Sequence, residues 1–299
     1  HLEEDGEKIE LTGYFDSKEF FQGSGDETYL VYGDTKVKVL SEPEPAELPW
    51  KEMVVDLVFE CTGRFTKDDA AKAHIEAGAK KVVLSAPSKG GSAKTYLKGV
   101  NAHEYSGEDL ISNASCTTNC IAPVINILND AFGVKKSAMT TIHAVTSTQN
   151  IVDGPSRKDM RRARAADYNV IPTTTGAALA TTKVIPSLDK KFDGMAVRVP
   201  VLVGSISDIT VLVNKKTSVD EVNQVFTGAS KTEQYKGIVE VSHEPLVSSD
   251  IVGSDFSAIV DLGMTKVVDG DLLKILAWYD NEWGYSNRLV DVGLMMIQN

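Results

Sequence analysis

Two cysteines four residues apart, in the stretch "NASCTTNC" (113–120), are the residues of this sequence best placed to do chemistry. Thiols at this spacing can ligate a metal, form a disulfide, fill a core position or supply a nucleophile. Zinc is not favoured, because the chain has no CxxC pair and its five histidines are scattered. The third cysteine, Cys61, makes the number odd, which argues against a disulfide framework and predicts a reducing cytoplasm.

A nucleophile is the most specific of these roles, and it belongs to Cys116. This residue stands at the start of a helix predicted over about 117–132, where unpaired amides and the helix dipole lower the pKa of a thiol. His143, on a strand predicted over 137–147, is the base that an activated thiolate requires. Each residue alone is more often structural, but together they favour a catalytic pair. Cys120, one turn further on, is expected in the core.

The elements that must position these residues begin with a parallel crossover unit. Residues 54–63 form a near-continuous apolar run, 66–79 have helical spacing, and 80–87 form a second apolar run. This order predicts two buried parallel strands joined by a helix. Ligands of such sheets bind at the carboxyl ends of the strands, here Cys61–Gly63 and Ser85–Pro87.

The rest of the chain predicts an α+β region on a mixed or antiparallel sheet. A long irregular basic segment over 149–176 precedes one helix near 218–230 and an amphipathic C-terminal helix. Further short strands are expected in "ETYLVYGDTKVKVL", and "SEPEPAELPW" is expected to be loop. The later strand-like runs lie at 194–214, 235–241, 257–261 and 266–280.

Composition limits the partners. With 299 residues the chain is long enough for two domains, and its net charge of −11 argues against nucleic acid or an anionic membrane as the main partner. No apolar run approaches the roughly 20 residues that a membrane helix needs. We therefore interpret the basic run "RKDMRRARAA" as a subunit-interface segment.

Six motifs together identify a resemblance. They are "SNASCTTNC", "TTIHAVT", "RRARAA", "VIPTTTGAA", "RVPV" and "WYDNEWGYSNR". From about Val37 to the C-terminus the chain resembles phosphorylating glyceraldehyde-3-phosphate dehydrogenase. The resemblance implies a partial Rossmann-like parallel sheet domain (1–115 with the C-terminal helix 282–299) and a catalytic domain (116–281). It also implies a glycolytic, cytoplasmic homotetramer that uses NAD to oxidise and phosphorylate glyceraldehyde 3-phosphate.

The resemblance implies a role for each matching residue. Cys116 forms a thioester and His143 is its base. The substrate's own phosphate is implied to contact Thr146 and Arg198, whose guanidinium matches phosphate geometry. The remaining implied contacts are with inorganic phosphate for Ser115, Thr117, Thr175 and Gly176, and with NAD for Thr62, Gly63, Ser85 and Asn281. The segment "VDGPS" resembles the NAD-linked rather than the NADP-linked form.

The chain departs from the family at its start. The family opens with a strand, a Gly-rich turn and a helix that seat the cofactor pyrophosphate, and residues 1–36 match no such pattern. We expect the chain to be a fragment of a longer one, the alternative being the loss of ordinary NAD binding. Two other functions stay open: erythrose-4-phosphate dehydrogenase, and a non-catalytic interaction protein on a truncated dehydrogenase scaffold.

Overall fold

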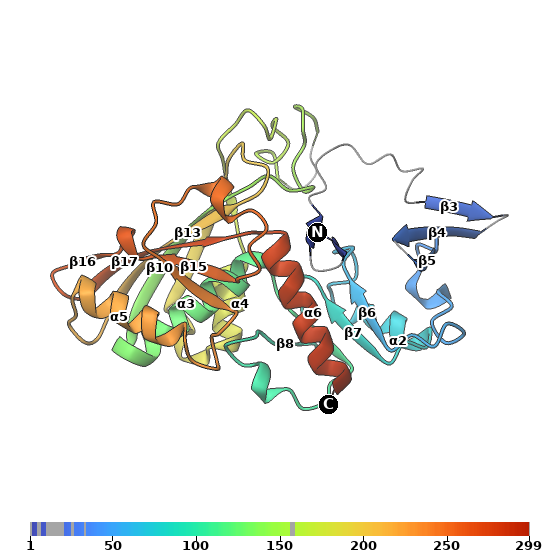
Figure 1. Ribbon diagram of the computed structural model, residues 1–299, viewed down its shortest axis with the longest axis horizontal. Helices are drawn as coiled ribbons and strands as arrows, with labels where there is room; N and C mark the ends of the chain where they lie inside the picture. Colours follow the sequence, from blue (N-terminus) through green and yellow to red (C-terminus); the bar gives the residue numbers. More distant parts are fainter. Residues whose placement is uncertain are drawn as a thin grey trace.

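A parallel sheet carries the strand ends at which ligand binding is expected (Figure 1). The computed structural model describes residues 2–4, 7–9, 21–24, 27–32, 34–155 and 159–298. In this part of the chain the sheet has the order β6-β7-β9-β8, with every pair parallel. Its strands are β6 (Leu57–Glu60), β7 (Lys81–Leu84), β8 (Lys94–Thr95) and β9 (Leu110–Ser112).

The crossover between β6 and β7 is helical, as expected, but shorter than the 66–79 prediction. It consists of the 3-10 helix η2 (Ala70–Lys72) and α2 (Ala73–Glu76). Asp68 and Asp69 have left-handed backbones, with φ of 47° and 62°, so the helix cannot begin before residue 70. The Asp69 carboxylate accepts hydrogen bonds from the Ser92 N–H at 2.8 and 2.9 Å, which ties this turn to the 88–94 loop.

The second sheet is mixed and runs β11-β12-β10-β13-β17-β15-β14, with β16 paired to β17. Only the β10–β12 and β14–β15 pairs are parallel among these described strands. Its strands are β10 (Val134–His143), β11 (Ile171–Thr174), β12 (Phe192–Arg198), β13 (Ser205–Val213), β14 (Val239–Ser242), β15 (Ala258–Asp261), β16 (Lys266–Val268) and β17 (Leu272–Tyr279). The predicted α/β plus α+β fold class is therefore confirmed.

Three helices pack against the mixed sheet: α3 (Cys116–Phe132), α4 (Ala177–Val184) and α5 (Val219–Ala229). The apolar face of α3 enters the main core, where Ile121, Ile125 and Leu128 meet strand residues such as Ile209 and Ile275. Burial of several large aliphatic side chains, each contributing about 1.5–3 kcal/mol, makes α3 a fixed platform for its first residue.

The C-terminal helix α6 (Trp283–Gln298) returns to the parallel sheet (Figure 1). Leu289, Val292 and Met296 pack there with Val83 and Ile111 in a second core. No helix in the described ranges is long and apolar enough to cross a membrane.

The remaining elements are short. The predicted strands in 27–40 are β4 (Glu27–Tyr32) and β5 (Thr35–Val39), and β3 (Phe21–Ser24) pairs with β4. β1 (Leu2–Glu4) and β2 (Glu7–Ile9) form an antiparallel pair. The other 3-10 turns are η1 (Pro45–Glu47), η3 (Ala102–Glu104), η4 (Pro186–Leu188), η5 (Ser248–Ile251) and η6 (Leu262–Met264).

Candidate active site

Cys116 is the first residue of α3, as the sequence predicts. Ser115 caps the helix, because its hydroxyl oxygen accepts a hydrogen bond from the Thr118 N–H at 3.2 Å. Just before the cap, Ala114 has φ of +53°, a left-handed backbone that residues other than glycine rarely adopt. This turn takes the chain from β9 into α3 and leaves the thiol half-buried in the wall of a cavity.

His143 is the last residue of β10, and its Nε2 lies 3.4 Å from Sγ of Cys116. The imidazole is buried, and its Nδ1 lies 2.7 Å from the carbonyl oxygen of Ala144. Nδ1 also faces the guanidinium of Arg198, so its role depends on the tautomer: with the proton on Nδ1 and donated to the Ala144 carbonyl, the lone pair of Nε2 faces the thiol. The two residues therefore meet in the orientation that a general base requires.

Arg198 reaches the same place through strand pairing. β10 and β12 run parallel with His143 opposite Arg198, so both side chains project from the same end of the sheet. The Nη1 of Arg198 lies 2.7 Å from the His143 Nδ1, 3.0 Å from the Ala144 carbonyl oxygen and 3.4 Å from the Thr146 hydroxyl. A fixed cation thus stands beside the base and beside Thr146.

The electrostatics of the pair correct one expectation. Burial raises the pKa of the Cys116 thiol, although hydrogen bonds with Thr117 and the charge of Arg198 act in the opposite direction. Burial outweighs the helix terminus that the sequence suggested would lower this pKa. Burial and the charge of Arg198 lower the pKa of His143 to about 4. The pair is therefore a neutral thiol and a neutral imidazole at neutral pH.

A cavity of about 190 Å³ joins these groups to the residues expected to bind phosphate. Two helices begin at it, α3 after Ser115 and α4 after Gly176, and helix N-termini favour anions. Thr146 is not among the residues that line the cavity, but its hydroxyl lies 3.4 Å from the Nη1 of Arg198, which does line it. The Thr117 hydroxyl is already bonded to the Tyr279 hydroxyl at 2.9 Å. The cavity is lined by Pro87, Ser115, Cys116, Thr117, Thr141, His143, Arg162, Thr174, Thr175, Gly176, Ala177, Ala196 and Arg198.

The polar side chains of the site that were not singled out from the sequence include Thr141, Arg162, Thr174 and Tyr279. Arg162 lines the cavity, with its Nε donating to the Thr173 hydroxyl at 2.9 Å. It belongs to the run interpreted as an interface segment, whose basic character was the available signal. Tyr279 packs against the Cys116–His143 pair. Its hydroxyl bonds to the Thr117 and Thr141 hydroxyls, and its ring lies edge-on to His143 with centroids 5.9 Å apart.

Asn281 is tied to the residue that follows the base. Its Oδ1 accepts hydrogen bonds from the Gly204 N–H at 3.1 Å and from the Ser205 hydroxyl at 2.9 Å. The Ser205 oxygen in turn accepts from the Ala144 N–H at 3.1 Å. The Asn281 Nδ2 has no hydrogen-bond partner among the described residues, although the side chain is buried. This donor fits a ligand that presents a carboxamide carbonyl, as nicotinamide does.

The other cofactor candidates lie at the ends of β6 and β7, as expected. The Ser85 hydroxyl donates to the Tyr285 hydroxyl at 3.1 Å, and Tyr285 donates to the Ala114 carbonyl at 3.2 Å, which links this strand end to the turn before Cys116. Gly63 has φ of +68° and open space above its Cα. The Thr62 hydroxyl is already engaged, because it donates a hydrogen bond to the Glu60 carboxylate.

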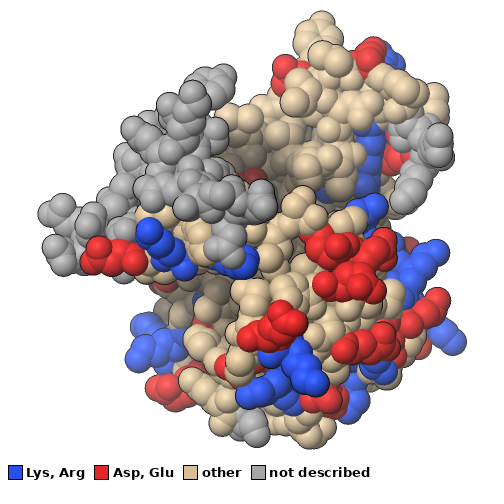
Figure 2. Space-filling model, turned by 90° about the vertical axis from the view of Figure 1, so that its right-hand side faces the viewer, with Lys and Arg blue, Asp and Glu red and all other residues tan. Residues whose placement is uncertain are grey.

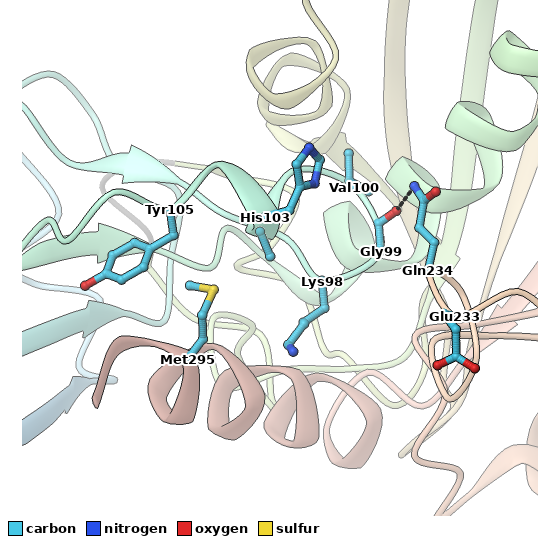
Figure 3. A pocket seen from close by; sticks show the side chains of 9 residues that line it. Lys98, Gly99, Val100, His103, Tyr105, Glu233, Gln234 and Met295 are labelled. Carbon is cyan, nitrogen blue, oxygen red and sulfur yellow. Dashed lines mark hydrogen bonds between the residues drawn. The ribbon is translucent and has the colours of Figure 1, made fainter. Parts of the chain in front are cut away.

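A second hollow in the molecule is larger than the cavity at Cys116. A hollow of about 650 Å³ lies between the 98–105 loop, residues 233–234 and α6 (Figure 3). The Lys98 side chain points toward α6, from which Met295 projects, while the Gln234 amide donates to the Gly99 carbonyl at 2.8 Å across one end. Its lining contains no cysteine and no buried imidazole, since His103 is exposed. The chemistry therefore belongs to the smaller cavity at Cys116.

Comparison with protein families agrees with the two regions of the fold. The model of the glyceraldehyde 3-phosphate dehydrogenase C-terminal domain matches residues 115–281, and that of the NAD binding domain of the same enzyme matches residues 12–68. The second match begins earlier than Val37, so the similarity extends into the segment that the motifs did not cover.

Several proteins that are similar to this chain over most of its length are named glyceraldehyde-3-phosphate dehydrogenase. Over 270 residues the chain is 52% identical to glyceraldehyde-3-phosphate dehydrogenase from Mycobacterium bovis (strain BCG / Pasteur 1173P2) and from Mycobacterium tuberculosis (strain ATCC 25618 / H37Rv). Each alignment covers 90% of this chain and 78% of the relative. Glyceraldehyde-3-phosphate dehydrogenase 2 from Staphylococcus aureus (strain N315) is 49% identical over 268 residues, 89% of this chain and 77% of the relative.

Proposed function

The chain belongs to the glyceraldehyde-3-phosphate dehydrogenase family, and we propose that Cys116 and His143 carry out its reaction. That reaction is the NAD-dependent oxidation and phosphorylation of glyceraldehyde 3-phosphate to 1,3-bisphosphoglycerate, through a thioester on the cysteine. The observation that carries the assignment is the 3.4 Å contact between Sγ and Nε2 in a cavity where two helices begin.

His143 moves the protons of this reaction. As Sγ of Cys116 attacks the aldehyde carbon, Nε2 accepts the thiol proton and returns it to the former carbonyl oxygen, which gives a thiohemiacetal. Bound NAD supplies the hydride acceptor for the oxidation. Nε2 takes the hydroxyl proton during that step, and Cys116 then carries a thioester. When inorganic phosphate attacks the thioester carbon, the C–S bond breaks and the departing sulfur recovers the proton from His143.

The substrate phosphate and the attacking inorganic phosphate would bind at different groups of residues in the site. Arg198 and Thr146, beside the base, suit the phosphate of the substrate. Ser115, Thr175 and Gly176, at the starts of α3 and α4, suit the attacking phosphate. Because its hydroxyl is engaged by Tyr279, Thr117 supports this site chiefly through its position in the first turn of α3.

Thr62, Gly63, Ser85 and Asn281 are the residues that would hold NAD. We assign residues 1–115 with 282–299 to its binding domain and 116–281 to the catalytic domain. The packing of α6 on β7 and β9 supports joining the C-terminal helix to the first group.

A homotetramer in the cytoplasm completes the proposal. Several large apolar side chains within 151–202 are exposed, with Tyr168 at 85% and Leu202 at 81%, and a subunit interface would cover them. On the face shown in Figure 2, acidic and basic side chains are interspersed over the lower part, while the described residues at the upper right carry few charges. The three cysteines are free thiols, which suits a reducing compartment.

Activity measurements on the full chain test the assignment. With NAD, glyceraldehyde 3-phosphate and inorganic phosphate, we expect NADH formation that Cys116→Ser abolishes and Cys61→Ser leaves intact. Arg198→Ala should cost about 1.5–3 kcal/mol of transition-state stabilisation for the phosphorylated aldehyde, as calculated from the ratio of kcat/KM values. The loss for unphosphorylated glyceraldehyde should be far smaller. Arg161→Ala, a change of an exposed arginine nearby, is the control.

Other outcomes distinguish the alternatives. A higher kcat/KM for erythrose 4-phosphate would favour erythrose-4-phosphate dehydrogenase. Absence of NADH formation with either aldehyde would favour a non-catalytic interaction protein.

A further inference from the structure

A buried carboxylate that the proposed reaction does not use stands at the end of β6. Glu60 is the last residue of this strand and only 3% exposed, and charged side chains are rarely buried to that extent unless they are paired. Its Oε1 accepts hydrogen bonds from the Thr62 N–H at 2.8 Å and from the Thr62 hydroxyl, and its Oε2 lies 2.8 Å from the His74 Nε2. Burial acts to raise the pKa of Glu60, but the hydrogen bonds from His74 and Thr62 hold it below its usual value.

The imidazole behind Glu60 is held in one tautomer. The Trp50 Nε1–H donates to the His74 Nδ1 at 3.0 Å, so Nδ1 carries no proton and the Nε2–H is directed to Glu60. The rings of Trp50 and Phe65 flank the imidazole, with centroids 6.2 and 6.4 Å from its own. From the indole to the carboxylate, every donor therefore meets an acceptor.

The network holds the turn that follows β6. Besides binding Glu60, the Thr62 hydroxyl oxygen accepts a hydrogen bond from the Arg64 N–H at 3.1 Å, so this side chain is occupied on both sides. Gly63 then adopts its left-handed backbone with nothing within 4 Å of where a Cβ would be. Its N–H has no hydrogen-bond partner among the described residues. What the turn offers to a ligand is its main chain.

We propose that Glu60, with His74 and Trp50 behind it, is a positioning residue for NAD. It presets the Thr62–Gly63 turn at the carboxyl end of a parallel strand, where dinucleotides bind. This inference rests on the proposed function, since NAD is the ligand that the turn receives. Replacing a buried charge by apolar groups is often neutral or stabilising, so its presence here calls for such a role.

Two pairs of variants test the proposal. Glu60→Gln places a donor against either His74 or Thr62, whereas Glu108→Gln removes a hydrogen-bonded carboxylate from the opposite edge of the same sheet. His74→Leu removes the hydrogen bonds of residue 74 with Trp50 and Glu60. His74→Gln retains one acceptor and one donor and should preserve both hydrogen bonds. NAD dissociation constants come from calorimetric titration, and the order of the turn comes from amide hydrogen exchange of a peptide containing Thr62, without NAD.

We expect Glu60→Gln and His74→Leu to raise the NAD dissociation constant and KM by about tenfold, with kcat nearly unchanged and faster exchange at Thr62. His74→Gln and Glu108→Gln should stay within about twofold of the unmodified chain. If Glu60→Gln lowers only the melting temperature, the residue is structural and the proposal is overturned. Failure of the unmodified chain to bind NAD would instead overturn the proposed function, and the exchange data would still report whether Glu60 holds the turn.

Discussion

Burial and a neighbouring cation determine the charge of His143 before substrate binds. Burial and the guanidinium of Arg198, 2.7 Å away, keep the imidazole neutral, with a pKa of about 4. Proton transfer from a thiol to a base this weak is unfavourable. A substrate phosphate on Arg198 would offset the guanidinium charge and raise the pKa of the base. If Arg198 holds the substrate phosphate as proposed, occupation of that site and the strength of the base are linked through one residue.

The same shift predicts an acid-dependent loss of stability. Because the folded-state pKa of His143 lies below the unfolded value near 6.5, its contribution is full above pH 6.5 and is lost as the pH falls toward 4. Between pH 7 and pH 5 we expect a loss of about 2 kcal/mol in the free energy of unfolding. His143→Gln should lack that part of the decrease. Urea unfolding of both proteins at the two pH values measures the difference, and parallel losses would contradict it.

Among the elements, α3 and α5 start in the same way but should respond differently to loss of their caps. Ser115 accepts from the Thr118 N–H, and Ser218 accepts from the Glu221 N–H, both at 3.2 Å. Ser115→Ala and Ser218→Ala should each cost about 1 kcal/mol of stability. Only Ser115→Ala should also raise the KM for inorganic phosphate. Thermal unfolding and steady-state kinetics on both variants check this, and an equal kinetic effect would remove Ser115 from the phosphate site.

Two helix glycines should give opposite signs when changed to alanine. A Cβ on Gly284, in the first turn of α6, would lie 2.6 Å from the Phe256 carbonyl oxygen, and backbone cannot easily yield. Gly284→Ala should cost about 1–3 kcal/mol and disturb the neighbouring Asn281 and Tyr285. Gly228 in α5 has nothing within 4 Å, so Gly228→Ala should gain about 0.5–1 kcal/mol. Chemical denaturation of both variants decides it.

Elements with a strong local signal could be predicted, and contacts between distant segments could not. The start of α3 followed from its capping residues. The strand β10 was expected from its apolar run, but at 137–147, and the observed strand Val134–His143 ends four residues earlier. The helix α4 was not predicted, because its eight residues, "AALATTKV", follow a run of threonines typical of a loop. Likewise, Tyr279 contacts Thr117 across 162 positions, a pairing created only by the packing of α3 on β17.

At the scale of the whole molecule, the exposed apolar side chains along 151–202 call for a covering surface. If copies of the chain provide it, Tyr168→Asp and Leu202→Asp should shift the protein toward smaller species, because a charge in an apolar interface is costly. Val268→Asp, at an exposed residue of β16, should leave the assembly intact. Sedimentation velocity distinguishes these outcomes. A monomer at all concentrations of the unmodified chain would refute the tetramer.

The parallel pairing of β10 and β12 also determines which length changes the enzyme can tolerate. His143 and Arg198 are adjacent because they occupy opposite positions in register. Deleting one residue of β12 before Arg198 would bring Val199 to that position and direct the guanidinium to the other face of the sheet. Inserting a residue at Val201–Val203, in the loop before β13, would leave the pair in place. Natural and engineered length variation is therefore expected in that loop and not in β12.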